Sequence, residues 1–396
     1  GTMRHARPWV AAVAIAMAPL PTIGLQPRPS PPPASVIPPP MPPLAKGSAP
    51  LVVPDDPLPP PPPPPLARFG LIADVQYANH DDAKNMVGNR VRRYRNSLQT
   101  LYCAVNHWNM LEEPRTTFAI ELGDMFDIKC KPHRWDAMTD ITTCMDNLEC
   151  NSWHISPGNH EYYSFNRVEL HSSVLKNAPS PYQLYYDFVP APGWRFLVLD
   201  GYDVSTIGAS DGEVGIQKAK AMLMSQNWNL NEKNIGGGGN WLNGVMGDKR
   251  RFLPYNGALG KKQLSWLRDT LRAAEAADEK VAVFCHLPVY PPCTNFNNLM
   301  FNFKEVQAIL ADTTDTVVAW FAGHDHDGGY ARDRNGIHHC VPCSPLETKP
   351  GEVSFGYVDI HEDKLTMHWT GKAPEHGDSD TGHKERWPTE LELVGF

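Results

Sequence analysis

The sequence has no apolar run long enough to span a lipid bilayer, and it has no excess of basic charge. A bilayer-spanning helix needs about 18 or more apolar residues, whereas the longest candidate, Trp9 to Ala18, is much shorter. The 36 basic and 44 acidic side chains give a formal charge of −8. This balance argues against a protein that binds nucleic acid or anionic membranes by general electrostatic attraction. We therefore expect no membrane span and no nucleic-acid partner.

Cysteine is also scarce, with eight residues in a chain of 396. This number is too small for a scaffold held together by disulfides. Cys340 and Cys343 have the spacing of half a zinc site, but no second Cys-x-x-Cys pair completes it, so we interpret them as thiols in a loop. Cysteine usage leaves the compartment open.

The first 65 residues differ in composition from the rest of the chain. They contain 23 of the 39 prolines and no Asp or Glu before Asp55. Proline lacks an amide hydrogen and has a fixed φ, so this stretch is expected to be extended polyproline II. We predict a disordered proline-rich tail over residues 1–65 and a catalytic domain over residues 66–396. Proline runs are ligands of SH3, WW or profilin-like partners, which makes a proline-recognising partner possible for residues 27–65.

The extreme N-terminus has the pattern of a targeting segment. Arg4 and Arg7 precede the apolar stretch Trp9 to Ala18, as the charged and apolar regions of a signal peptide do. A plastid or mitochondrial transit peptide and an extension without function are the alternatives. The sequence leaves these three interpretations, and with them the localisation, open.

From Leu66 onward, short β-rich runs alternate with amphipathic helical stretches. Helices are expected at 91–111, 133–148 and 261–276, and strands at 68–73, 117–121, 153–156, 194–199, 281–285 and 316–321. Near-continuous apolar strands that alternate with helices predict an α/β domain whose sheet is covered on both faces. Three further runs, at 336–341, 355–360 and 364–369, predict a second, mixed or antiparallel sheet. Residues 227–255 predict a long surface loop.

Polar side chains follow five of these strands. The clusters are Asp74-Val-Gln76, Gly123-Asp124-Met-Phe-Asp127, Gly158-Asn159-His160-Glu161, His286, and Gly323-His324-Asp325-His326. Open α/β sheets place their ligands at the carboxyl ends of their strands, so we expect the clusters to converge. Each cluster alone could be an ordinary turn or a capped loop. Together, their oxygen and imidazole groups predict a site for divalent ions such as Mn, Mg, Fe or Zn.

The ordered clusters resemble the motifs of the calcineurin-like metallophosphoesterase superfamily, which read DxH, GDxxD, GNH(E/D), H and GHxH. One position departs, because Gln76 stands where most members have histidine. In this the chain resembles the Mn²⁺-dependent ADP-ribose/CDP-alcohol diphosphatases. Further similarity lies at 69–78, 92–95, 199–203, 256–257, 263–267, 286–291 and 323–330. The resemblance covers Phe69 to about Gly371. It implies an α/β fold in which two mixed β-sheets form a sandwich flanked by helices.

The resemblance also implies two divalent metal ions, for which we expect manganese. One ion would be held by Asp74, Gln76, Asp124 and His326, and the other by Asp124, Asn159, His286 and His324, so that Asp124 bridges them. An amide oxygen in place of an imidazole nitrogen at Gln76 favours Mn or Mg over Zn, Cu or Fe. His160 would be the catalytic residue that protonates or supports the leaving group. We expect Asp127 to orient a ligand rather than to bind metal.

The implied reaction is hydrolysis of the pyrophosphate bond of ADP-ribose and CDP-alcohols of the CDP-choline type by a two-metal-activated hydroxide. The substrate would thus be a small molecule linked to a nucleoside diphosphate. The alternative is a dinuclear metallophosphatase or phosphodiesterase that acts on phosphomonoesters or cyclic nucleotides. A third possibility is a non-enzymatic scaffold that descends from a phosphoesterase and has lost its activity. Such a protein should also have lost metal ligands, whereas all five motifs are present here. Members of the family are otherwise mostly cytosolic.

Two other groups of residues have competing interpretations. Four arginines, at positions 90, 92, 93 and 95, could reach a substrate phosphate or could form a solvated helix face. The side chains of Tyr77, Met86 and Tyr202 could stack on a nucleobase, or they could simply pack inside the domain. We leave both groups outside the predicted site.

Overall fold

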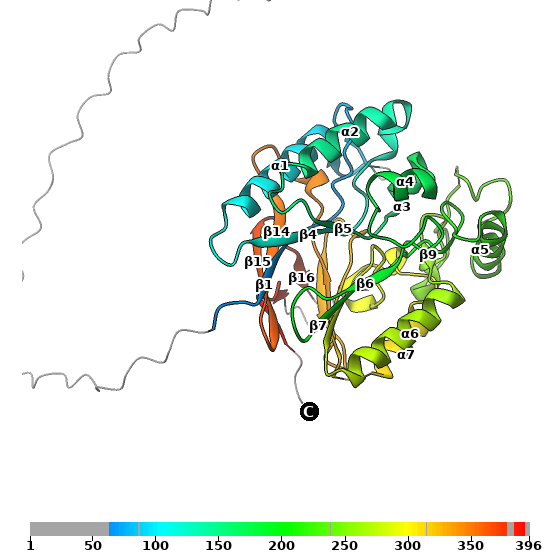
Figure 1. Ribbon diagram of the computed structural model, residues 1–396. Coiled ribbons are helices and arrows are strands. Elements are labelled where there is room, and N and C mark those ends of the chain that lie inside the picture. The colour runs from blue at the N-terminus through cyan, green and yellow to red at the C-terminus, as the bar shows by residue number, and fades with distance from the viewer. Residues whose placement is uncertain (1–62, 86–87, 238, 314, 378–383, 393–396) are drawn as a thin grey trace, which may run out of the picture. The chain divides into compact units, whose positions relative to one another are not determined.

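The computed structural model describes residues 63–85, 88–237, 239–313, 315–377 and 384–392 (Figure 1). Residues 1–62, which hold the predicted leader and almost all of the predicted proline-rich tail, lie outside the described residues, and so does Met86. All described residues fall in one compact unit, Pro62–Phe396.

Two six-stranded sheets form the centre of this unit. The first contains, in spatial order, β18 (Glu390–Glu392), β15 (Lys364–Gly371), β14 (Ser354–Ile360), β1 (Ala67–Ile72), β4 (Thr116–Glu121) and β5 (Trp153–Ile155). The second contains β12 (Gly329–Arg332), β13 (His338–Val341), β11 (Val317–Phe321), β10 (Lys280–Phe284), β7 (Trp194–Val198) and β6 (Tyr186–Phe188). Short pairs join β2 (Ala83–Lys84) to β3 (Val91–Arg92), β8 (Val204–Ser205) to β9 (Gly257–Ala258), and β16 (Glu375–Gly377) to β17 (Lys384–Arg386).

Both sheets are mixed. In the first sheet β1, β4 and β5 are parallel, whereas β14, β15 and β18 add antiparallel pairs. In the second sheet β7, β10, β11 and β13 are parallel, with β6 and β12 antiparallel at the two edges. The predicted sandwich of two mixed sheets is therefore confirmed.

An aromatic layer joins the two sheets. Phe69 of the first sheet lies 5.4 Å from Phe196 and 5.9 Å from Phe284 of the second, measured between ring centroids, with both pairs edge to face. Phe69 also stacks on Phe118 of its own sheet at 5.2 Å. Edge-to-face and offset stacked geometries are those that aromatic quadrupoles favour. Burying each such side chain contributes about 1.5–3 kcal/mol, so this layer holds the sheets face to face.

Helices cover the outer faces of the sandwich (Figure 1). On the first sheet, α1 (Tyr94–Met110) packs against β1 and β14 with α2 (Arg134–Met145) beside it, and α6 (Lys261–Ala276) and α7 (Phe303–Ala311) lie on the second sheet. The other helices are α3 (Asn159–Ser164), α4 (Arg167–Ser173), α5 (Glu213–Gln226), and the 3₁₀ turns η1 (Ile128–His133), η2 (Gly247–Arg251), η3 (Pro291–Cys293), η4 (Phe296–Asn298) and η5 (Pro345–Glu347). In the described part of the chain, none of these helices combines the length and the apolar character needed to cross a bilayer.

The prediction that the three C-terminal strands form a separate sheet is wrong. Strand β13 pairs with β11, and β14 pairs with β1, so these strands complete the two main sheets and form no sheet of their own. Ala67 lies opposite Ile360 in this pairing, and a hydrophobic pattern identifies a strand without identifying such a distant neighbour. For the same reason the six predicted strands are divided between the two sheets.

Helix prediction was partly successful. Helix α6 has the expected bounds, whereas α1 begins at Tyr94 because Val91–Arg92 pairs with Ala83–Lys84 as a short hairpin. Helices α3, α4, α5 and α7 were not predicted. Residues 227–255 are mostly turns, as expected, with η2 near their end. Cys340 lies on β13, so Cys340 and Cys343 do not share a loop.

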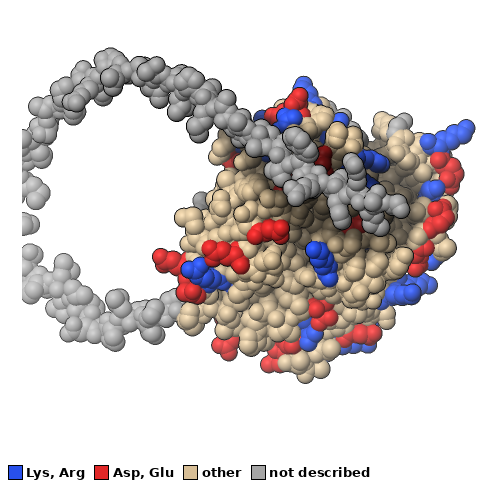
Figure 2. Space-filling view, turned by 45° about the horizontal axis from the view of Figure 1, so that its top comes forward, with Lys and Arg blue, Asp and Glu red and all other residues tan. Residues whose placement is uncertain are grey.

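The surface does not gather charge of one sign on the face drawn in Figure 2. Basic and acidic side chains are interspersed there, and broad uncharged areas separate them. This mixture agrees with the small net charge, and such a surface has little general attraction for polyanions.

Candidate metal centre

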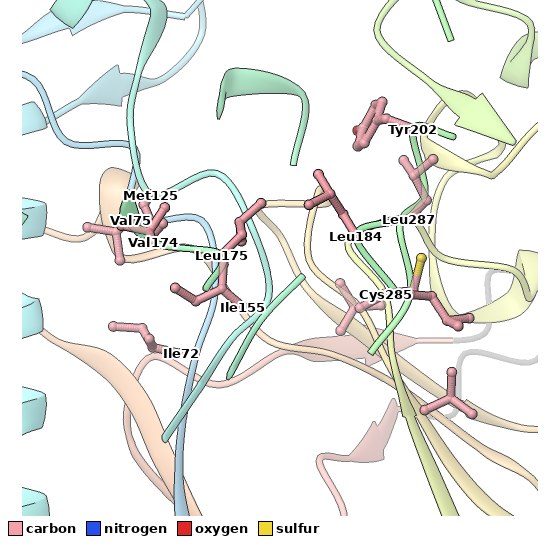
Figure 3. Packing of buried hydrophobic residues seen from close by; sticks show 14 of the residues in the cluster. Ile72, Val75, Met125, Ile155, Val174, Leu175, Leu184, Tyr202, Cys285 and Leu287 are labelled. Carbon is pink, nitrogen blue, oxygen red and sulfur yellow. The ribbon is translucent and has the colours of Figure 1, made fainter. Parts of the chain in front are cut away.

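The seven predicted ligands follow strands of both sheets. Residues 74 and 76 follow β1, residue 124 follows β4, residue 159 follows β5, residue 286 follows β10, and residues 324 and 326 follow β11. Figure 3 shows buried apolar side chains, among them Ile72, Ile155 and Cys285, packed at these strand ends. The first five ligands are at most 4% exposed, whereas His324 and His326 are half-buried. The two histidines therefore lie on the accessible side of the group.

The backbone is strained at four of these positions. The φ angles are +53° at Asp74, +42° at Gln76, +63° at Asp124 and +70° at His324. Left-handed φ values are uncommon outside glycine, although Asp, Asn and His tolerate them better than other residues do. Each such residue costs on the order of 1–3 kcal/mol. The sharp turns at the strand ends direct these side chains toward one another.

Two motif glycines provide the space for this convergence. A Cβ atom at Gly323 would lie 2.7 Å from Oδ2 of Asp74, and one at Gly158 would collide with Oδ1 of Asp124. Both contacts are too close for any residue with a Cβ atom. The glycines of the GHxH and GNH motifs are thus required because carboxylates from another loop occupy the space beside them.

The imidazoles of His286 and His324 face each other with their unprotonated nitrogens. Nδ1 of His286 lies 2.7 Å from the carbonyl oxygen of Leu122, and Nε2 of His324 lies 2.7 Å from Oδ1 of Asn256. Since these oxygens only accept, each of these nitrogens carries the hydrogen of its neutral ring. The other two nitrogens, Nε2 of His286 and Nδ1 of His324, are 3.1 Å apart.

A cation explains this arrangement of lone pairs. Burial lowers the pKa of His286 to about 4 and holds the pKa of His324 well below its usual value, so neither ring is charged at neutral pH. Oδ2 of Asp124 is 3.5 Å from Nε2 of His286, and one ligand atom from each of these three residues lies within 4.8 Å of the others. Two imidazole lone pairs and a carboxylate at this separation fit a divalent ion.

Asp74, Gln76 and His326 form the neighbouring group. Nε2 of His326 is 3.8 Å from Oδ1 of Asp74 and 2.9 Å from Nε2 of Gln76, and the Gln76 amide donates to Oδ2 of Asp124 at 3.0 Å. Among the described residues, none donates to the buried Oε1 of Gln76. A half turn of the amide would bring this oxygen toward a carboxylate and an imidazole. A cation ligand is the role that such an oxygen fits.

Asn159 lies at the edge of the same group. Its Oδ1 accepts a hydrogen bond from the hydroxyl of Tyr202 at 3.1 Å, and the Tyr202 ring lies 6.0 Å from the His286 ring. Glu161, two residues on, accepts hydrogen bonds from the backbone N–H groups of Asp124 and Gly158. Glu161 thereby ties the loop that carries Asp124 to the loop that carries Asn159.

Four buried carboxyl groups are concentrated at the candidate ligand group. Burial, followed by repulsion from Asp124, raises the pKa of Asp74 well above its usual value and that of Glu161 to about 7. Burial raises the pKa of Asp124 to about 8, and burial with repulsion from Glu161 raises the pKa of Glu121 strongly. Buried carboxylates need a compensating charge. The donor set, the orphaned amide oxygen and this excess of acid all fit bound divalent cations.

His160 lies beside the ligand group and has an assigned proton. Its backbone N–H donates to Oδ1 of Asp124 at 2.7 Å, and its Nδ1 accepts from the backbone N–H of Ile128 at 3.2 Å. Burial, with a contribution from Arg92, keeps the pKa of His160 well below its usual value. The neutral ring therefore carries its hydrogen on Nε2. Oδ2 of Asp127 is 3.4 Å from Nδ1 of His160, so Asp127 contacts His160 rather than any of the seven ligands.

The arginine cluster divides between the two interpretations. Arg92 lies near the site, with Nη1 at 3.7 Å from Oδ2 of Asp127 and Nε at 3.9 Å from Oε1 of Glu347. Arg95 instead pairs with Asp81 on the surface. The side chain of Arg90 bonds to Asp327 and Glu347, and that of Arg93 bonds to backbone carbonyl groups of Glu347 and Thr348. The rings of Tyr77 and Tyr202 are buried inside the domain, and the hydroxyl of Tyr202 bonds to Asn159.

Sequence reasoning missed the residues that orient the ligands. Oε1 of Glu347 is 3.3 Å from Nδ1 of His326, an arrangement that orients metal-binding imidazoles in other proteins. Hydrogen bonding to His326 and the charge of Arg90 offset the burial of Glu347 and lower its pKa to about 2. Asn256 and Tyr202 orient His324 and Asn159 in the same way. Glu347 lies in no motif. Glu161 belongs to the GNH(E/D) motif, and Tyr202 and Asn256 lie in stretches of family similarity, but the sequence did not reveal that these residues orient others.

Comparison with known proteins gives consistent matches. The calcineurin-like phosphoesterase family matches residues 67–328. The chain is 39% identical over 305 residues to a manganese-dependent ADP-ribose/CDP-alcohol diphosphatase of Oryza sativa, which covers 76% of this chain and 90% of the relative. A relative of the same name from Homo sapiens is 31% identical and covers 78% of this chain and 92% of its own length. The crystal structure of a dimetal phosphatase from Danio rerio superposes with a TM-score of 0.70 at 31% identity and covers 83% of this chain and all of its own.

Proposed function

Because the chain belongs to the calcineurin-like phosphoesterases, and within them to the manganese-dependent ADP-ribose/CDP-alcohol diphosphatases, we propose that it hydrolyses the pyrophosphate bond of ADP-ribose and CDP-alcohols. The observation that carries the chemistry is the facing pair of lone pairs on His286 and His324 beside Asp124. The substrate class rests on the activity named for the relatives.

Two divalent ions, manganese by analogy with these relatives, would occupy the site. Asp74, Gln76, Asp124 and His326 would hold one ion, and Asp124, Asn159, His286 and His324 would hold the other. When bound, such a pair supplies Lewis-acid activation of water and of phosphoryl oxygens. Gln76 and Asn159 are neutral, so two aspartates facing two divalent ions leave the site net positive. This charge would attract the pyrophosphate and orient it toward the ligands.

His160 would donate a hydrogen bond from Nε2 to the leaving phosphate and so stabilise the charge that develops there. Replacing His160 by alanine should lower kcat about 10²–10³-fold, the usual cost of removing one such donor. Bound manganese should change little, because His160 is not among the proposed ligands. Steady-state kinetics on ADP-ribose and elemental analysis of the same preparation measure the two quantities.

His160→Asn is the matched control for this prediction. Asparagine can still accept the N–H of Ile128 near the place of Nδ1, but it has no group at the place of Nε2. If kcat falls equally in both variants, the lost Nε2–H donor is responsible. If His160→Asn keeps full activity, Nε2 of His160 does not stabilise the leaving phosphate.

A panel of substrates tests the proposed reaction. The manganese-loaded protein should hydrolyse ADP-ribose to AMP and ribose 5-phosphate and should also cleave CDP-choline. Cyclic AMP and p-nitrophenyl phosphate should be poor substrates. Preference for these last two would reject the diphosphatase and favour a metallophosphatase or phosphodiesterase built on the same ligands.

For the proline-rich segment we propose a separate role in binding a proline-recognising partner. Support comes from its composition, because a polyproline II ligand is preformed and loses little entropy on binding. Deletion of residues 3–65 should leave kcat and KM on ADP-ribose unchanged. The deletion should remove binding to a panel of SH3, WW and profilin domains, measured by fluorescence anisotropy. A large fall in kcat would place part of the catalytic domain before residue 66.

A further inference from the structure

We propose that Asn256 is a positioning residue that fixes the tautomer of His324 and so keeps one metal position open. The inference rests on the metal site of the proposed function, but it concerns a residue outside the seven proposed ligands. Asn256 lies between residues 227–255, for which the sequence predicted only a loop, and the start of β9. It is fully buried.

The side-chain amide of Asn256 has a single possible orientation. Its Nδ2 donates to the carbonyl oxygens of Arg251 and Asn297, both at 2.8 Å. If the amide turned over, Oδ1 would face two acceptors and both buried carbonyls would lose their donor. Oδ1 is therefore held toward His324, at 2.7 Å from Nε2.

This orientation determines where His324 carries its hydrogen. Oδ1 can only accept, so Nε2 must donate, and a neutral imidazole has only one N–H. The lone pair of Nδ1 is then directed at Nε2 of His286, 3.1 Å away. His286 has the opposite tautomer, because its Nδ1 donates to Leu122 at 2.7 Å. Both lone pairs point into the same space, and neither ring can satisfy the other.

Loss of Asn256 would permit a competing arrangement. The hydrogen of His324 could move to Nδ1 and bond to Nε2 of His286, because 3.1 Å is already a hydrogen-bond distance. Such a bond between the two imidazoles would occupy both nitrogens that the metal needs. The Asn256 amide thus prevents a hydrogen bond between His324 and His286 that would otherwise form in the metal-free protein.

A second asparagine in the same segment provides a matched control. Asn227 is also fully buried, and its Nδ2 donates to two backbone carbonyls, those of Trp241 and Phe252, both at 3.0 Å. Its Oδ1 accepts from the backbone N–H of Asn229 and not from an imidazole. Asn256→Leu and Asn227→Leu therefore remove equivalent tethers of the segment, and only the first removes the acceptor of His324.

Manganese affinity distinguishes the two variants. The full-length protein is stripped of metal and titrated with Mn²⁺, and the unbound ion is followed by its electron paramagnetic resonance signal. Asn256→Leu should weaken the affinity about 10–100-fold, the usual effect of losing such a partner, whereas Asn227→Leu should match the parent. Equal affinity of both variants would overturn the inference. Failure of the parent itself to bind Mn²⁺ would instead refute the proposed function.

The tautomer can also be read in the parent chain, which keeps the test valid if Asn256→Leu does not fold. Nitrogen NMR of the metal-free protein labelled at histidine should show the hydrogen on Nε2 of His324 and on Nδ1 of His286. The variants His324→Gln and His286→Gln serve only to assign these signals. A hydrogen on Nδ1 of His324 in the parent would overturn the inference.

Discussion

Replacement of Asp124 by asparagine should lower kcat/KM on ADP-ribose about a thousandfold. Asp124 is the proposed ligand shared by both ions, and it is in contact with Gln76 and His286. Loss of its charge weakens both metal positions together, and several kcal/mol of metal-ion catalysis correspond to about three orders of magnitude in rate. Manganese content should fall in parallel, as measured by elemental analysis after dialysis.

Two features make this substitution informative. Asparagine tolerates the φ of +63° found at position 124 almost as well as aspartate does, so the backbone should be preserved. Asp127→Asn is the matched control, since Asp127 is equally buried in the same motif but contacts His160 and Arg92. This control should retain its manganese. If Asp124→Asn also keeps its manganese and more than a tenth of its activity, Asp124 does not bridge the two ions.

The metal-free protein should become less stable as the pH rises from 6.5 to 8. Asp124 has a pKa of about 8 and Glu161 one of about 7 when folded, far above their values in an unfolded chain. In this range the folded state therefore binds more protons than the unfolded state does. Unfolding free energy then falls with pH, by at most about 1.4 kcal/mol per pH unit for each carboxyl. Urea titrations of chelated protein at several pH values measure this slope.

The window begins at pH 6.5 because buried histidines act in the opposite direction below it. The pKa of His286 is about 4, so this ring must gain a proton on unfolding below its usual value of 6.5. Stability from this residue rises with pH between about 4 and 6.5 and is then constant. Above that point these histidines no longer oppose the effect of the carboxyl groups.

Two controls follow from the same reasoning. Bound manganese compensates the carboxylates, and metal affinity increases with pH, so saturating Mn²⁺ should abolish or reverse the slope. In metal-free Asp124→Asn one of the titrating groups is absent, so the slope should be shallower. If the stability of the metal-free parent stays constant or rises between pH 6.5 and 8, Asp124 and Glu161 do not have the raised pKa values that their burial implies.

The sequence allowed prediction of the candidate ligands but not of the groups that orient them. Asp74, Asp124 and His286 stand directly after apolar strands, and strand ends of both sheets meet at one place. The orienting groups, such as Asn256 and Glu347, come from loops far away in the chain. Their role depends on which atom an amide or carboxylate faces, and no local pattern encodes that. The sequence also did not predict which sheet each strand joins. Strand β14, for example, pairs with β1, which lies at the other end of the domain's sequence.

The aromatic layer between the sheets determines which property of the protein a core substitution would affect first. The first sheet carries Asp74 and Asp124, the second carries His286 and His324, and Phe69 spans the seam between them. A core substitution that lets the sheets slide by a fraction of an ångström would separate donors that must share one ion. A substitution at this seam would thus first lower the metal content of the enzyme, while the chain is still folded.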